Sequence, residues 1–186
     1  MELNREKIVQ AAINQFNTQG IQGASISAIA AEAGISKGTL YYYYQSKDSL
    51  IHDCFSIVKQ NAKEITFLHL DMSLPPEQLI REFVHASFRW PLTYPEQLRF
   101  MDSYISLYFY EKKAYSLFLF DMLCEENVTP AMRNALRDDL PLELLNFLVG
   151  KTLTHVCKYA IACPEFINNE AYIKASAEMI WNMIKK

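Results

Sequence analysis

Residues 25–47 read SISAIAAEAGISKGTLYYYYQSK, and this segment predicts the architecture of the first part of the chain. Ser25 precedes an apolar run at helical spacing and therefore predicts the N-cap of a short helix. Gly34 follows that run directly, at the point where a reversal of direction needs a left-handed residue. Ser36 predicts a second cap and a second short helix. Together these signals predict a helix-turn-helix, although a bare helical corner of this kind also occurs in other helical proteins.

The flanking sequence predicts further helices and no strands. Ile8, Ala12 and Phe16 lie on one stripe of a helix from about residue 4 to 19, and Gly20 is a plausible terminator. Ser46 predicts the cap of a helix that runs to about Leu70. Apolar residues continue at helical spacing, and they predict helices near residues 76–90, 95–109, 114–140, 141–162 and 169–184.

The second helix of the motif carries polar and aromatic side chains instead of an ordinary apolar stripe. Four consecutive tyrosines, residues 41–44, cover every side of a helix, so some rings must face solvent. Phenol and serine or threonine hydroxyls donate to phosphate oxygens, and Lys37 lies at the end that a recognition helix points at the bases. Gly38 costs a helix about 1 kcal/mol relative to alanine, which close approach of the backbone to a DNA groove would explain. The pattern predicts a DNA-contacting helix.

Residues 23–51, GASISAIAAEAGISKGTLYYYYQSKDSLI, closely resemble the signature of the TetR family of transcriptional regulators. The resemblance covers the first fifty residues and fades after Leu50. It implies an all-α protein with a three-helix DNA-binding head at residues 1–46 and a helical effector-binding and dimerisation body at residues 47–186. It also implies DNA contacts from Ser25, Ser36, Lys37, Gly38, Thr39, Tyr41, Tyr42 and Lys47.

Two tyrosines depart from the family pattern. Tyr43 stands where the family often has histidine, and its role as a DNA contact stays open. Tyr44 stands where the family usually has phenylalanine, so we expect it in the core of the head.

The body is rich in aromatic residues and methionines, which suit an apolar cavity with a few polar anchors. We expect a small hydrophobic or aromatic effector there, although ordinary core packing is the alternative for each residue. The candidates for this pocket are His85, Ser87, Trp90, Tyr104, Tyr108, Phe118, Met122 and His155. The last two helices carry an apolar face that is wide for one small bundle, and they predict a homodimer. An effector that displaces the heads would release operator DNA, the behaviour of a repressor.

The composition narrows the function classes. The net charge is −3 and the first fifty residues are neutral, so we expect binding to depend on specific contacts rather than on a strong basic field. The four cysteines and four histidines show no metal-ligand spacing, and no phosphate loop or nucleophile elbow is present. The sequence therefore predicts no metal, no cofactor and no enzymatic activity. Without an apolar run long enough to cross a membrane, it predicts a cytoplasmic protein.

Three alternatives remain at this point. The first is a DNA-binding regulator whose body binds a protein partner and no small molecule. A helical enzyme is a more distant alternative, and a purely structural helical dimer is the third. Tyrosines that face solvent argue against the structural dimer. The operator, the effector, the target genes and the choice between repression and activation do not follow from the sequence.

Overall fold

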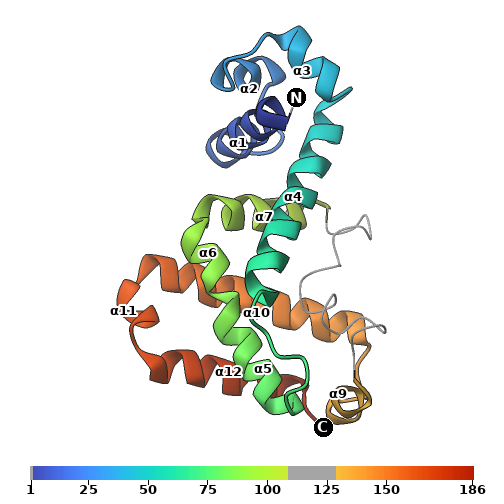
Figure 1. Ribbon diagram of the computed structural model, residues 1–186, viewed down its shortest axis with the longest axis vertical. Coiled ribbons are helices and arrows are strands. Elements are labelled where there is room, and N and C mark those ends of the chain that lie inside the picture. The colour runs from blue at the N-terminus through green and yellow to red at the C-terminus, as the bar shows by residue number, and fades with distance from the viewer. Residues whose placement is uncertain (1, 109–128) are drawn as a thin grey trace. The chain divides into compact units, whose positions relative to one another are not determined.

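The computed structural model describes residues 2–108 and 129–186, and every regular element in these ranges is a helix (Figure 1). One isolated antiparallel bridge joins Leu136 to Lys185. The all-α prediction is confirmed. In chain order the helices are α1 (Glu2–Gln19), α2 (Ile26–Glu32), α3 (Lys37–Tyr43), α4 (Lys47–Phe67), α5 (Pro76–Ser87), α6 (Arg89–Thr93), α7 (Pro95–Tyr108), α9 (Pro130–Ala135), α10 (Leu142–Ala162), α11 (Pro164–Ile167) and α12 (Glu170–Ile184).

The turns and caps of the first four helices follow the sequence signals. Ser25, Ser36 and Ser46 each accept a hydrogen bond from the backbone amide three residues on, at 3.1, 3.0 and 3.0 Å. Gly20 and Gly34 have φ angles of 75° and 69°, the left-handed conformation that glycine adopts without steric cost. The predicted helix-turn-helix is therefore present as α2, the turn at Gly34, and α3.

A single helix was expected over residues 76–90, but two are found. α5 ends at Ser87 and α6 begins at Arg89. Pro91 explains the break, because proline has no amide hydrogen to donate to the carbonyl of Ser87, and its ring clashes with that carbonyl in a regular helix.

The helix expected over residues 114–140 is also corrected where the structure describes it. Only Pro130–Ala135 is helical within residues 129–140. Leu136 is extended and bridges Lys185, while the amide of Arg137 donates to the carbonyl of Ile184 at 2.8 Å. The backbone hydrogen bonds of this segment thus go to the chain's C-terminal residues instead of continuing a helix.

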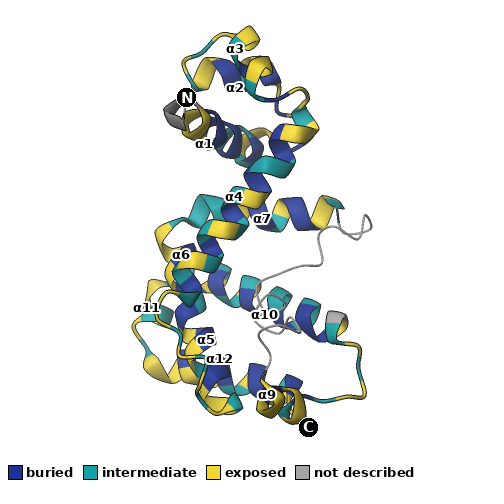
Figure 2. Cartoon of the chain, turned by 45° about the vertical axis from the view of Figure 1, so that its right-hand side comes forward, coloured by how far each residue is buried: buried dark blue, intermediate teal, exposed yellow. Residues whose placement is uncertain are grey.

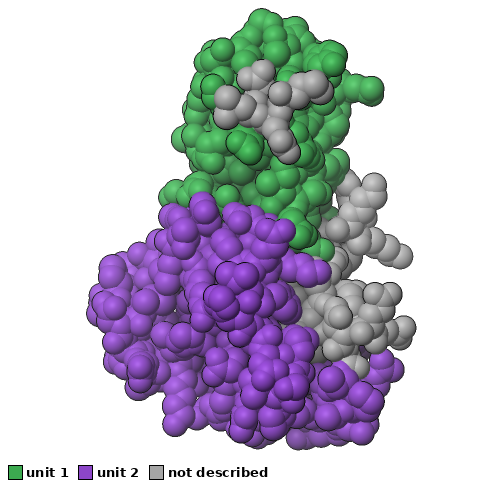
Figure 3. Space-filling model, viewed as in Figure 1, with its two compact units in different colours: residues 1–60, 96–108 green, residues 61–95, 109–186 purple. Residues whose placement is uncertain are grey.

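The chain divides into two compact units (Figure 3). The first holds residues up to Gln60 together with residues 96–108, and the second holds residues 61–95 with the described residues from 129 onward. The first unit extends beyond the head predicted at residues 1–46, because it includes most of α4 and all of α7 except Pro95. The boundary between the units falls inside α4.

Within the first unit, aromatic side chains pack α7 against α1 and α4. Phe16 of α1 stacks on Phe100 with ring centroids 5.5 Å apart, and Phe55 of α4 stacks on Tyr104 at 3.9 Å. The Tyr104 hydroxyl also lies 2.7 Å from Nδ1 of His52. Figure 2 shows the buried residues along α1, α2 and the first half of α4. These contacts give the helix-turn-helix a rigid base.

The second unit is built around α5 and α12, which lie side by side (Figure 1). Their buried faces include Ile80 and Phe83 of α5 and Ile180 of α12, each fully excluded from solvent. An ion pair at the rim joins Arg81 to Glu178, with Nη1 and Oε1 3.3 Å apart. Burial of such apolar side chains contributes about 1.5–3 kcal/mol each to stability.

Candidate nucleic-acid interface

One face of α3 packs against the other helices of the first unit, and the opposite face is exposed to solvent. Leu40 is fully buried, and Tyr44, which ends the helix, is 6% exposed. Tyr41 and Tyr42 are 45% and 76% exposed. Because soluble proteins rarely leave two neighbouring large aromatic side chains in water, this face has the character of a contact surface.

Lys37 and Tyr41 lie one helical turn apart on α3. The Lys37 Nζ atom lies 5.8 Å from the centroid of the Tyr41 ring, within the range of a cation–π contact. At the start of the same helix the hydroxyls of Ser36 and Thr39 are 2.8 Å apart. A lysine ammonium, a phenol and two hydroxyls therefore gather on one short helix, and these are the donors that contact phosphates and base edges.

Tyr43 is half-buried and its ring meets that of Tyr42 edge to face, with centroids 5.5 Å apart. This contact restrains the otherwise exposed Tyr42 ring.

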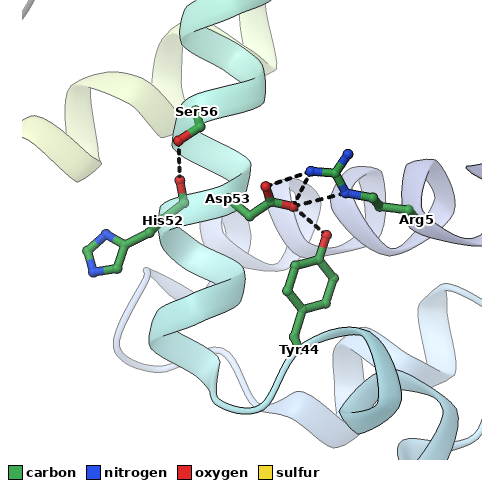
Figure 4. Close-up of polar contacts among 5 residues, drawn as sticks. All are labelled: Arg5, Tyr44, His52, Asp53 and Ser56. Carbon is green, nitrogen blue, oxygen red and sulfur yellow. Dashed lines mark hydrogen bonds and ion pairs between the residues drawn. The ribbon is translucent and has the colours of Figure 1, made fainter.

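Tyr44 belongs to the core of the head, as predicted. Its hydroxyl donates to Oδ2 of Asp53 at 2.6 Å, and the Arg5 guanidinium donates to both oxygens of the same carboxylate, with the shortest distance 2.7 Å (Figure 4). Burial, followed by the bond to Asp53, raises the pKa of Tyr44 well above its ordinary value. The bond to Asp53 likewise raises the pKa of Arg5. The phenol is therefore neutral at physiological pH and joins the end of α3 to α1 and α4.

Lys47, the predicted phosphate contact, already holds one partner. Its ammonium donates to the backbone carbonyl of Gln22 at 2.6 Å, which ties the start of α4 to the turn before α2. An ammonium carries three hydrogens, so two remain for another acceptor. Ser25 is exposed at the start of α2, where a phosphate could reach its hydroxyl.

Gly23, which precedes α2, and Gly38, which lies inside α3, differ in what constrains them. A Cβ atom added to Gly23 would lie 2.4 Å from the carbonyl oxygen of Gln19, so the turn itself requires glycine there. At Gly38 the nearest atom to an added Cβ is Oγ of Ser36 at 3.7 Å, an ordinary contact. The fold therefore does not require glycine at position 38. Close approach of a DNA partner to the backbone would be a reason for glycine there.

The predicted pocket residues are divided between the units. Tyr104 and Tyr108 belong to the first unit, where both rings contact His52, at centroid distances of 5.8 and 5.2 Å. Trp90 is buried in the second unit, and Ser87 donates to the carbonyl of Phe83. Phe118 and Met122 lie outside the described residues.

The two predicted histidine anchors are exposed. His155 has Nδ1 2.8 Å from the carbonyl of Lys151. His85 lines a hollow of about 310 Å³ between α5 and α12, together with Arg81, Glu82, Glu170, Ile173, Lys174 and Ala177. Charged side chains rim that hollow, and none of the other predicted pocket residues lines it.

The expected dimer helices α10 and α12 use part of their apolar face inside the second unit. Leu145 and Val149 of α10 and Ile180 of α12 are buried there. Other apolar side chains stay outside: Leu144 is 41% exposed and Met179 50%. Ala171 and Ala175 are exposed on α12 as well.

Within residues 2–108 and 129–186, no helix has both the length and the hydropathy that a membrane crossing requires.

Comparison with known proteins agrees with this geometry. Residues 8–54 match the family model for bacterial regulatory proteins of the TetR family. The chain is 50% identical over 46 residues to the HTH-type transcriptional regulator YvdT of Bacillus subtilis, covering 25% of this chain and 24% of YvdT. It is 36% identical over 73 residues to the class D tetracycline repressor protein of Escherichia coli, covering 39% of this chain and 30% of that protein. The chain thus spans less than a third of the length of these relatives.

The fold is shared over the whole chain with a solved structure. A TetR family transcription regulator from Shewanella sp. PV-4 superposes with a TM-score of 0.82 at 22% identity and covers 98% of each chain. The matched residues 8–54 contain α2, α3 and the exposed tyrosines described above. Residues 8–54 therefore belong to the TetR family of bacterial regulatory proteins, and the chain shares the fold of a TetR family transcription regulator.

Proposed function

We propose that the chain is a sequence-specific DNA-binding transcriptional regulator that inserts α3 into the major groove of its operator. The observation that carries this proposal is the exposed face of α3, where Lys37, Tyr41 and Tyr42 point away from a core held by Leu40 and Tyr44. No acidic residue lies between Gly34 and Lys47, so this face approaches a phosphate backbone without local repulsion. A DNA partner supports a cytoplasmic location.

The DNA-contact set of the proposal is Ser25, Ser36, Lys37, Gly38, Thr39, Tyr41, Tyr42 and Lys47. The hydroxyls, the ammonium groups and the phenols serve as donors to phosphates and base edges. Gly38 serves by letting the backbone come close. Because the first fifty residues carry no net charge, we expect operator affinity to depend on the geometry of these contacts more than on long-range electrostatic attraction.

Operator binding by the purified chain tests the proposal. Lys37→Ala and Tyr42→Phe should both weaken binding to a DNA site selected from random sequence, with the melting temperature unchanged. Lys174→Ala, an exposed lysine on α12, is the matched control and should bind as the wild type does. Unchanged operator affinity in both α3 variants would overturn the assignment of α3 as the reading helix.

A homodimer through α10 and α12 completes the proposal. Met179 and Leu144 remain exposed on these helices although each helix is largely apolar, which supports a surface that a second copy covers. Met179→Glu should convert the dimer to a monomer in sedimentation velocity runs. Leu68→Glu, at a side chain 70% exposed near the end of α4, is the control that should leave the dimer intact. A dimer that survives Met179→Glu would contradict this seam.

The proposed regulation is release from DNA by a small hydrophobic or aromatic effector. α4 runs from the first unit into the second, so a ligand that shifts the second unit has a continuous helix through which to act. A coupling of about 1–3 kcal/mol would suffice. Regulation by a protein partner that binds the body is the second candidate, and the partly polar hollow at His85 favours it over a buried ligand. An effector screen scored by loss of operator binding separates the two.

A further inference from the structure

We infer that Tyr41 acts on DNA recognition as a positioning residue, whose ring holds the Lys37 ammonium in place to read a guanine in the major groove. The inference rests on the proposed function and assigns different roles to the two exposed tyrosines of α3. Its basis is the contact between the Lys37 Nζ atom and the Tyr41 ring, at 5.8 Å from the ring centroid.

The four-residue spacing of Lys37 and Tyr41 brings the two side chains together on α3. Residues four apart lie on the same side of a helix, one turn above the other. Leu40 and Tyr44 on the neighbouring side are buried, so the backbone that carries Lys37 and Tyr41 is fixed. A lysine side chain on such a backbone still has four rotatable bonds, and ordering it costs up to about 2 kcal/mol of conformational entropy. A ring that restrains it before DNA arrives removes part of that cost.

An aromatic ring can orient a lysine side chain without neutralising its charge or accepting its ammonium hydrogens. A carboxylate would neutralise the charge and accept the hydrogens, but in the described part of the chain no ion pair to Lys37 is found. The ring leaves all three ammonium hydrogens free to donate. Two acceptors at the right separation, N7 and O6, stand together on guanine in the major groove, and lysine pairs with them. The chemistry therefore points to guanine as the base that Lys37 contacts.

The ring of Tyr41, and not its hydroxyl, should carry the coupling to Lys37. Tyr41→Phe keeps the aromatic face, so Lys37→Met should weaken operator binding as much in this variant as in the wild type. Tyr41→Leu removes the face and should lower affinity about two- to five-fold, the range expected for an exposed cation–π contact. Tyr41 is 45% exposed, so leucine fits without disturbing the core.

A double-mutant cycle with a modified base tests the inference. Operator affinity is measured by fluorescence anisotropy for the wild type, Lys37→Met, Tyr41→Leu and the double variant. Each protein is titrated on operators with guanine or 7-deazaguanine, which lacks the N7 acceptor, at each guanine of the half-site. We expect one position where the wild type loses about five-fold or more and Lys37→Met loses nothing further. Tyr41→Leu should reduce that loss, and it should have no added effect in the Lys37→Met background.

Three results would overturn the role assigned to the Tyr41 ring or to guanine. If Tyr41→Leu weakens binding by the same factor with and without Lys37, the ring does not act through the lysine. Loss of the coupling to Lys37 in Tyr41→Phe would assign the role to the hydroxyl, and insensitivity of the wild type to every 7-deazaguanine would exclude guanine. Each of these overturns the inference while operator binding itself persists. Absence of any operator binding by the wild type would overturn the proposed function, and with it this inference.

Discussion

The Tyr44 hydroxyl donates to Oδ2 of Asp53 at 2.6 Å, and this single bond joins the residue that ends α3 to the second turn of α4. Arg5 of α1 holds the same carboxylate from the other side (Figure 4). A charged group that three helical segments share thus holds the end of α3 against α1 and α4. Hydrogen bonds to charged groups are about twice as strong as neutral ones.

Tyr44→Phe tests the contribution of this bond. The ring keeps its packing, but the bond to Asp53 is lost, so the free energy of unfolding should fall by about 1–2 kcal/mol. Urea denaturation at pH 7 measures the change. Tyr42→Phe, on an exposed side chain, should leave stability unchanged. Equal stability of Tyr44→Phe and the wild type would show that Arg5 alone satisfies the carboxylate.

This cluster marks a limit of sequence reasoning. The caps at Ser25, Ser36 and Ser46 are local signals, because each serine binds an amide three residues away, and all three were predicted. Arg5 and Asp53 are 48 residues apart and share no motif, so nothing in their spacing indicates a pair. The role of Tyr44 as core was predicted, but the partner of its hydroxyl was not.

The body shows the same limit more strongly. Helical spacing located α5, α7, α10 and α12 to within a few residues. It did not predict the break at Pro91, although the proline itself was a sufficient signal, or the end of α9, which depends on a bridge to Lys185 near the chain terminus. Pocket residues could not be chosen from the sequence, because their assignment depends on which helices face one another, and Tyr104 and Trp90 fall in different units.

Gly38→Ala should change stability and DNA binding in opposite directions. Alanine fits the space at position 38 and favours a helix, so the free energy of unfolding should rise by up to about 1 kcal/mol. The added methyl group meets the DNA groove, and operator affinity should fall by at least about five-fold.

Gly23→Ala is the matched control for this prediction. Its Cβ would lie 2.4 Å from the Gln19 carbonyl oxygen, so the protein should lose more than about 1 kcal/mol of stability. Thermal melts and anisotropy titrations provide both readouts. Operator affinity that is unaffected by Gly38→Ala would show that the backbone of α3 does not approach DNA closely.

Ser36→Asp separates the cap from the DNA contact at one position. Aspartate caps a helix as well as serine does, so the fold should keep its stability. The new carboxylate lies on the DNA-facing helix and should weaken operator binding about ten-fold at low salt, with a smaller effect as salt rises. Thr129→Asp, which also replaces a capping hydroxyl by a carboxylate, at the N-cap of α9, should leave binding unchanged. Wild-type affinity of Ser36→Asp would place this position away from the phosphate backbone.

The buried thiols should make the protein sensitive to alkali. Burial raises the pKa of Cys157 from 9.0 to about 12, and burial also raises the pKa of Cys54. In the unfolded chain the thiols ionise near pH 9, so above that pH the unfolded state holds fewer protons than the folded state and stability falls. The contribution is fully present below pH 9 and is lost between pH 9 and 12. For Cys157 the loss at pH 10 should be about 1.4 kcal/mol.

Cys157→Ala measures this contribution. The variant loses some packing at every pH, but its stability should fall less steeply than that of the wild type between pH 8.5 and 10. Urea midpoints at these two pH values give the comparison. Parallel pH dependence in the two proteins would mean that the Cys157 thiol ionises in the folded state as readily as in the unfolded chain.

Hydroxyl-radical footprinting of the selected operator tests whether α3 reads DNA from a symmetric dimer. We expect protection with two-fold symmetry, in two half-sites whose centres lie one helical turn or a multiple of it apart, about 10–10.5 base pairs per turn. We also expect Lys37→Ala to remove the pattern at a salt concentration where the wild type is fully bound. Protection of a single unsymmetric patch, or a pattern that Lys37→Ala leaves intact, would show that α3 does not read the operator from a symmetric dimer.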